Sequence, residues 1–108
     1  MSFTYLASPY TKYPRGREEA FELVCNKAAE LMLKGEKIFC PIAHSHPIED
    51  LGMVDKQSGD FWLEQDFAIM SHANKLKVYT MEGWDSSVGV LREIDFAKKH
   101  GIPIEYIT

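Results

Sequence analysis

The sequence predicts an α/β protein in which a small parallel sheet is covered by helices on both faces. Short apolar runs alternate with segments of helical periodicity, which is typical of parallel sheets. The chain has 108 residues, enough for one domain and too few for two. Its residues are 45% hydrophobic and 26% charged, as in globular proteins with a core of their own. We therefore expect a single domain over residues 1–108.

The first half of the chain predicts a strand, a helix, a second strand and an irregular segment. The apolar run 3–7 predicts a buried strand. Apolar residues three or four apart predict a helix over 17–34, with Gly35 where a helix C-cap belongs. A second strand is expected over 37–40. The stretch 42–59 has no sustained period, and a loop of that length is usually functional or contains a short helix.

The second half predicts two further helices and two further strands. A helix is expected over 60–72, a strand over 76–80 and a last strand over 103–107. Between these strands, Ser87 caps a helix that stops at Gly101. Ligands of parallel sheets bind beyond the carboxyl ends of the strands, so we expect the loops that leave those ends to converge.

Charge and composition narrow the classes of partner. The chain has 12 basic and 16 acidic residues and a net charge of −4. Proteins that bind nucleic-acid polymers or membrane surfaces have an excess of basic residues, so neither kind of partner is expected. Neither a signal peptide nor a membrane-spanning apolar stretch is recognisable, so a cytoplasmic protein is expected. The two cysteines, Cys25 and Cys40, are too few for a disulfide framework and are expected to be free thiols.

The segment WDSSVGVLRE, residues 84–93, is the first candidate site. Ser87 at a helix N-terminus leaves free backbone N–H groups and the positive end of the helix dipole, and both favour an anion. Gly89 lies four residues before Glu93 and therefore on the same helix face, where it leaves a ligand access to the carboxylate. The alternative is that Ser87 is only a cap and Glu93 a solvated helix residue.

Asp66 is the second candidate, because apolar residues flank it closely in FWLEQDFAIM. If it points inward, its pKa is perturbed and it could serve as an acid, a base or a ligand for hydroxyl groups. The alternative is a surface acid on an amphipathic helix.

Two loops supply further candidates. In the segment PIAHSHPIED, His44, His46 and Asp50 could bind a metal ion, line a substrate site or be plain polar loop residues. In SPYTKYPRGR, Ser8 follows the first strand, and Lys12 and two arginines carry positive charges. These cations could bind phosphate oxygens, and the alternative is a solvated basic loop. The spacing is neither that of a P-loop nor that of GxGxxG.

Three segments resemble the nucleoside 2-deoxyribosyltransferase-like superfamily: YLASPY, EQDFAIMSHANKLKVY and SSVGVLREIDFAKKHGIPI. The resemblance covers nearly the whole chain. It implies a flavodoxin-like or Rossmann-like three-layer sandwich with four to five parallel strands. It also implies that Glu93 is the nucleophile, that Asp66 binds the sugar and is a candidate acid, and that Tyr5 lies near the reacting carboxylate.

Within the superfamily, the chain is more similar to the branch that hydrolyses nucleoside 5′-monophosphates and to small bacterial and phage members. Ser87 stands where the nucleoside transferases carry Asp, six residues before the glutamate. The run Arg15-Gly16-Arg17 resembles the loop that holds the phosphate in that branch. The chain departs from the family in the pair Ala73-Asn74, where the family has Ala-Asp, and in the histidine segment, which has no counterpart.

We therefore expect an enzyme that cleaves the N-glycosidic bond of a (deoxy)nucleoside 5′-monophosphate or related nucleoside, by hydrolysis or by transfer. The candidate phosphate-binding residues are Ser8, Arg15, Gly16, Arg17 and Ser87, and Gly89 is a further candidate substrate-binding residue beside Glu93. The candidate base-binding residues are Tyr10, His44, His46, Trp62 and Trp84. No metal or organic cofactor is expected, and the resemblance implies a homodimer or larger homo-oligomer. A non-catalytic nucleotide-binding sensor and a metal-dependent hydrolase built on His44, His46 and Asp50 remain as alternatives.

Overall fold

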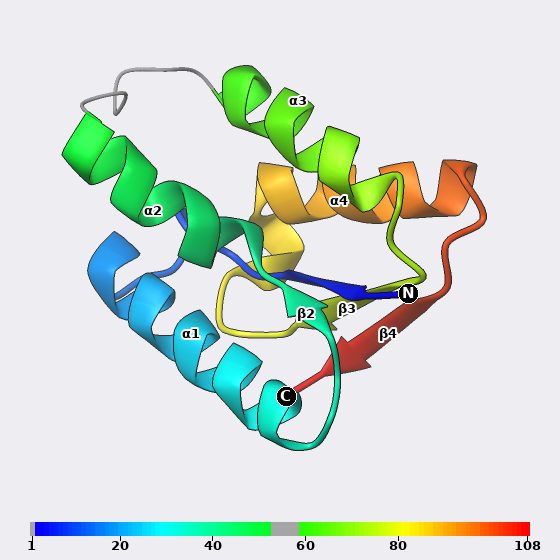
Figure 1. The fold of residues 1–108 in the computed structure, drawn as a ribbon. Coiled ribbons are helices and arrows are strands. Elements are labelled where there is room, and N and C mark those ends of the chain that lie inside the picture. The colour runs from blue at the N-terminus through cyan, green and yellow to red at the C-terminus, as the bar shows by residue number, and fades with distance from the viewer. Residues whose placement is uncertain (1, 53–58) are drawn as a thin grey trace.

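The computed structural model describes residues 2–52 and 59–108. Over these residues a single sheet contains four strands, all parallel, in the order β2-β1-β3-β4. The strands are β1 (Thr4–Ala7), β2 (Ile38–Phe39), β3 (Lys75–Tyr79) and β4 (Ile104–Ile107). The helices are α1 (Arg17–Leu33), α2 (Pro41–Gly52), α3 (Gly59–Met70) and α4 (Val88–Lys99), with a short 3-10 helix η1 (Trp84–Ser86) (Figure 1).

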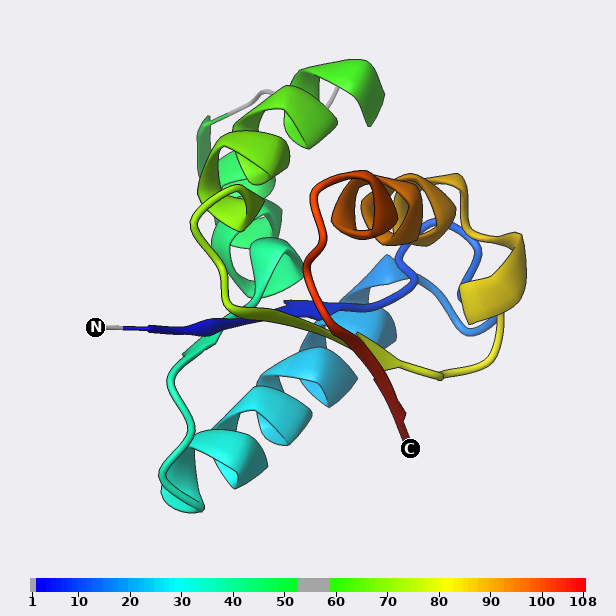
Figure 2. The same ribbon diagram turned by 90° about the vertical axis from the view of Figure 1, so that its right-hand side faces the viewer.

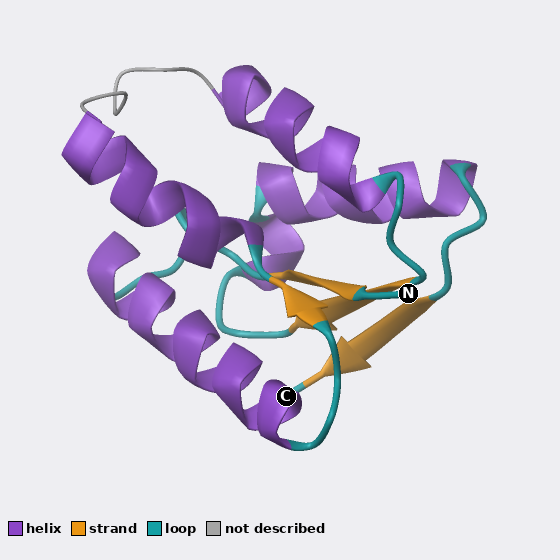
Figure 3. Ribbon diagram, viewed as in Figure 1, coloured by secondary structure: helices purple, strands orange, loops and turns teal. Residues whose placement is uncertain are grey.

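The chain forms a small three-layer α/β fold, which confirms the predicted fold class (Figure 3). Helix α1 covers one face of the sheet, and α3 and α4 cover the other (Figure 2). Each predicted strand and the three predicted helices are present, with ends within two residues of those expected. No helix among the described residues is long and apolar enough to cross a bilayer. Cys25 and Cys40 are free.

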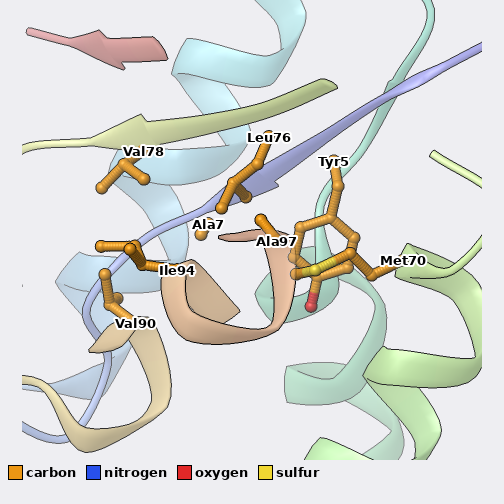
Figure 4. Close-up of a cluster of buried hydrophobic side chains, with 8 residues drawn as sticks. All are labelled: Tyr5, Ala7, Met70, Leu76, Val78, Val90, Ile94 and Ala97. Carbon is orange, nitrogen blue, oxygen red and sulfur yellow. The ribbon is translucent and has the colours of Figure 1, made fainter. Parts of the chain in front are cut away.

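The central strand β1 contributes to the core on both faces of the sheet, because successive residues of a strand point to opposite sides. Leu6 packs with residues of α1, including Val24 and Ala28. Tyr5 and Ala7 point the other way, into the cluster beneath α3 and α4 (Figure 4). That cluster consists of Tyr5, Ala7, Met70, Leu76, Val78, Val90, Ile94 and Ala97. The Tyr5 ring is therefore held inside this core, with its hydroxyl at the far end from the strand (Figure 4).

The carboxyl ends of β1, β2 and β3 lie at the same edge of the sheet, because the three strands are parallel and in register. Tyr5 pairs with Phe39 on one side and with Leu76 on the other. The connection that leaves β1 runs through α1 over one face, and the connection that leaves β3 runs through α4 over the other (Figure 2). The edge next to β1 is thus the switch point at which α/β proteins bind ligands.

Of the two possibilities stated for the stretch 42–59, the structure shows a helix, because Pro41–Gly52 form α2. The buried residues of α2 include Pro41, Ser45 and Glu49, which are spaced by four as on one helix face. Two of these are polar, so an apolar pattern could not reveal the helix. Pro47 also lies inside α2, where proline normally argues against a helix. Residues 53–58 of the expected loop lie outside the described residues.

Candidate active site at the carboxyl edge of the sheet

A cavity of about 500 Å³ opens at this edge, between the loop after β1 and the first turns of α2, α3 and α4. It is lined by Ser8, Tyr10, Thr11, Lys12, Arg17, Pro41, Ile42, Ser45, Glu49, Asp60, Trp62, Leu63, Asp66, Ser87, Val88, Gly89, Val90, Arg92 and Glu93. Eight of the fourteen residues expected at the site line it: Ser8, Tyr10, Arg17, Trp62, Asp66, Ser87, Gly89 and Glu93.

Glu93 and Asp66 both line this cavity although they belong to different helices. On α4, Glu93 lies between the buried residues Val90 and Ala97, which precede and follow it by three and four positions. On α3, Leu63 and Met70 are buried at the same spacings from Asp66. Helix geometry therefore turns both carboxyl groups toward the protein interior. Only 5% of Glu93 and 8% of Asp66 is exposed, so neither is the solvated helix residue of the alternative interpretation.

Burial changes the acidity of both carboxyl groups. It raises the pKa of Glu93 to about 8; the nearby charge of Asp66 raises this pKa further, and a hydrogen bond from Tyr5 lowers it. Burial also raises the pKa of Asp66 to about 7. The Tyr5 hydroxyl donates its hydrogen bond to Oε2 of Glu93, and burial keeps the pKa of Tyr5 well above its usual value. The site thus contains two carboxyl groups that exchange protons near neutral pH.

A second part of the cavity offers hydrogen-bond donors and positive charge. Ser87 caps α4, with its Oγ accepting from the backbone N–H of Val90 at 3.3 Å. Ser8 is 5% exposed, and its Oγ has no hydrogen-bond partner among the described residues. Lys12 lines the cavity and forms no ion pair within residues 2–52 and 59–108. Because buried hydroxyl groups are normally paired, the free Ser8 oxygen indicates room for a ligand atom.

Arg17 lies in the cavity wall with its charge already shared. Its Nη2 donates to Oε1 of Glu49 at 2.7 Å and to the hydroxyl of Tyr10 at 2.9 Å. Its guanidinium also lies over the Tyr10 ring, 4.8 Å from the ring centre. The three side chains form a rigid polar wall, in which Arg17 is less free to meet a ligand than Lys12.

A protein-family model described as a domain of unknown function (DUF1937) matches residues 2–108 of the chain. The chain belongs to the DUF1937 family. None of the curated proteins matches the sequence. The matched range includes Tyr5, Asp66 and Glu93, so the acid pair and its tyrosine lie within the DUF1937 domain.

In this DUF1937 chain, two residues expected at the phosphate do not line the cavity. Arg15 is exposed and pairs with Glu19, one helical turn further on, and with Glu82. Gly16 precedes α1 at a φ of 100°, where its freedom from a Cβ permits the backbone turn. Arg15 and Gly16 thus lie outside the cavity, and the arginine turns to its acidic neighbours.

Three of the side chains expected at the base also lie outside the cavity. His44 is exposed on α2 and packs against the ring of Phe39. Trp84 belongs to η1 and packs against the core and Tyr106. His46 is buried and contacts the cavity only through the Tyr10 hydroxyl at its Nδ1 among the described residues. The helical form of α2 explains why His44 and His46 lie apart, since residues two positions apart on a helix point in different directions.

The ligand set expected for a metal-dependent hydrolase does not come together either, because His44 points away from His46. Glu18 of α1 takes its place: the ligand atoms of Glu18, His46 and Asp50 all lie within 4.8 Å of one another. Sequence spacing could not reveal this group, because Glu18 is 28 residues from His46.

The sequence interpretation missed several cavity residues. Ser45 and Glu49 were not predicted as cavity residues because the sequence did not reveal helix α2. Arg92 and Asp60 escaped because each is an exposed charge, and only the packing of α3 against α4 joins them in an ion pair at the rim. The four-residue spacing of Pro41, Ser45 and Glu49 was the one available signal.

Proposed function

We propose that this protein cleaves the N-glycosidic bond of a (deoxy)nucleoside 5′-monophosphate, with water or a second base as acceptor. The observation that supports this most strongly is the presence of Glu93 and Asp66 in one cavity, with Tyr5 bonded to Glu93. A cavity of about 500 Å³ is within the usual range for sites that enclose a small molecule.

In the proposed reaction, the carboxylate of Glu93 attacks the anomeric carbon of the sugar. A C1′–O bond forms as the C1′–N bond breaks, and the bonding electrons leave with the base. The protonated carboxyl of Asp66 supplies the proton that the departing base nitrogen takes up. Water or a second base then attacks C1′, the C1′–O bond to Glu93 breaks with its electrons returning to the carboxylate, and the now ionised Asp66 takes up the proton of the acceptor. Tyr5 holds one oxygen of Glu93 and leaves the other free to react.

The phosphate would lie at the start of α4. Val88 and Gly89 are the first residues of this helix, where backbone N–H groups have no acceptor within the helix. The unpartnered Ser8 hydroxyl and the Lys12 ammonium line the same cavity and add a hydrogen-bond donor and a positive charge. This position requires no Asp at residue 87, and a carboxylate there would repel the phosphate.

Release of free base from a panel of nucleoside 5′-monophosphates, measured by liquid chromatography, tests the proposal. We expect base from at least one monophosphate, and slower release from the matching nucleoside. Glu93→Gln removes the nucleophile and should reduce turnover by about a thousandfold or more. Glu64→Gln, which removes an exposed carboxylate from α3, is the matched control and should retain activity. If the folded wild-type protein releases no base from any member of the panel, the enzyme proposal is wrong.

The raised pKa of Glu93 favours a second candidate, a nucleotide-binding module in which this carboxyl stays protonated. In that case a monophosphate should raise the melting temperature without any release of base. Glu93→Gln should then bind as well as the wild type, since an amide mimics a protonated carboxyl.

A further inference from the structure

A second group of ionisable side chains lies between α1 and α2, outside the cavity. Nε2 of His46 is 2.9 Å from Oε2 of Glu18 and 3.4 Å from Oδ2 of Asp50. His46 and Asp50 are one turn apart on α2, and Glu18 belongs to the first turn of α1. Three potential ligand atoms from two helices therefore converge on one point.

The separations between these atoms suit a metal ion. Ligand atoms around a tetrahedral zinc ion lie about 3.3 Å from one another when each is about 2.0–2.1 Å from the metal. The two separations from Nε2, 2.9 Å to Glu18 and 3.4 Å to Asp50, are close to this value. Glu18 and Asp50 are 70% and 52% exposed, so both carboxylates can rotate and water can complete the coordination.

Among the described residues, no Lys or Arg forms a direct ion pair with Glu18 or Asp50. The charge of Arg17 acts on Asp50, but the guanidinium itself pairs with Glu49. Without an ion, Nε2 of His46 has at most one hydrogen to share between two carboxylates. A cation at this point would compensate both charges.

His46 is held in the way that a metal-binding histidine requires. It is 6% exposed, and its ring stacks on Phe21 with 4.2 Å between the ring centres. Its other nitrogen, Nδ1, is 2.5 Å from the hydroxyl of Tyr10. When Nδ1 donates its hydrogen to that oxygen, Nε2 is left with a free lone pair aimed at the two carboxylates. Such a partner at the second nitrogen orients the ring and raises its basicity toward metals.

We propose that Glu18, His46 and Asp50 bind a divalent transition-metal ion of the zinc type, which joins the start of α1 to α2. An imidazole nitrogen with carboxylate oxygens suits zinc, whereas Mg²⁺ and Ca²⁺ prefer all-oxygen sites. The ion would lie behind Tyr10 and Arg17 and steady this wall of the cavity, because Tyr10 contacts both His46 and Arg17. The site uses neither Glu93 nor Asp66, so it stands or falls independently of the proposed activity.

Titration of the EDTA-treated, desalted protein with zinc tests this site. Calorimetry should give one ion per chain, and the melting temperature should rise with zinc. The ¹⁵N resonance of His46 Nε2 should shift, while those of His44, His72 and His100 should not. Glu18→Gln and Asp50→Asn should each weaken zinc binding by about tenfold or more. The controls His44→Gln and Glu64→Gln change neighbouring or unrelated surface groups and should bind zinc as the wild type does.

Three results would overturn the site. The first is a wild-type affinity no greater than that of Glu18→Gln, and the second is a zinc-induced shift at another histidine in place of His46. The third is displacement of zinc by an equal concentration of Mg²⁺, which indicates an unspecific acidic surface. Both variants replace exposed carboxylates by amides of the same shape, and circular dichroism in EDTA shows whether each is folded.

Discussion

Ser8 has a buried hydroxyl oxygen without a hydrogen-bond partner among the described residues. Such a group costs about 1–3 kcal/mol of folding free energy relative to a paired one. Ser8→Ala should therefore leave the free energy of unfolding unchanged or increase it slightly. If Ser8 meets the phosphate, the same change should weaken monophosphate binding by about tenfold, because hydrogen bonds to charged groups contribute about 1.5–3 kcal/mol.

Binding to Ser8→Ala is best measured by calorimetry in a Glu93→Gln background, which prevents turnover. Ser86→Ala is the matched control, since Ser86 is exposed and its hydroxyl donates to the Gly83 carbonyl. Equal monophosphate affinities for the two serine variants would remove Ser8 from the phosphate site.

The proton affinities of Glu93 and Asp66 predict the pH dependence of catalysis. The reactive form has an ionised Glu93, whose pKa is about 8, and a protonated Asp66, whose pKa is about 7. A plot of kcat/KM against pH should then be a narrow bell with its maximum at about 7.5. Asp66→Asn should lower the rate and abolish the fall on the alkaline side. A wild-type profile that is flat from pH 6 to 9 would be incompatible with these roles.

At the scale of elements, the turn before η1 depends on Gly83. Its φ is 92°, and a Cβ at this position would overlap the carbonyl oxygen of Lys12. Gly83→Ala should therefore destabilise the protein and displace Lys12 from the cavity. Gly35→Ala is the matched control, because Gly35 has a φ of 96° but no atom within 4 Å of an added Cβ.

The comparison separates backbone strain from collision. Gly35→Ala should cost about 1–2 kcal/mol, which is the strain of a left-handed backbone alone. Gly83→Ala should cost at least about 1 kcal/mol more, as measured by urea unfolding. Equal losses in the free energy of unfolding for the two variants would mean that the loop containing Lys12 shifts without cost when residue 83 gains a Cβ.

The helices differ in how far sequence could reveal them. Helix α4 has buried apolar residues at Val90, Ile94 and Ala97, so its periodicity is visible despite the buried glutamate. Helix α2 buries Ser45 and Glu49 instead, and its contacts with α1 and β1 stabilise a segment that contains an internal proline. Buried polar groups on the inner face of α2 are stabilised by partners from other elements, such as Arg17 for Glu49. A local sequence pattern does not contain such partners.

At the scale of the whole molecule, stability should fall as pH rises above about 5. In the unfolded chain Asp66 and Glu93 lose their protons at about pH 3.9 and 4.3, whereas their folded-state pKa values are about 7 and about 8. The folded protein thus binds more protons in this window, so the free energy of unfolding decreases up to about pH 8. Exposed acids such as Glu19 and Glu105 have lowered pKa values, so they affect the free energy of unfolding only at lower pH.

Urea unfolding at pH 5.5 and 8.5 measures this effect. The wild type should lose on the order of 5 kcal/mol between the two conditions, with the larger share from Glu93. Glu93→Gln keeps the shape of the side chain but cannot ionise, so it should lose less and be more stable than the wild type at pH 8.5. A wild-type stability that rises over this range would show that the two acids are not buried as in the structure.

The sequence by itself determined the order of the strands and of helices α1, α3 and α4, the parallel sheet and the edge at which its loops meet, because apolar periodicity and capping residues act over one or two turns of chain. Tertiary structure alone decided that Glu93 and Asp66 face one cavity, that Arg15 and His44 turn away, and that Glu18 meets His46. These outcomes depend on how helices pack across a sheet. Contacts between residues tens of positions apart leave no local pattern in the sequence.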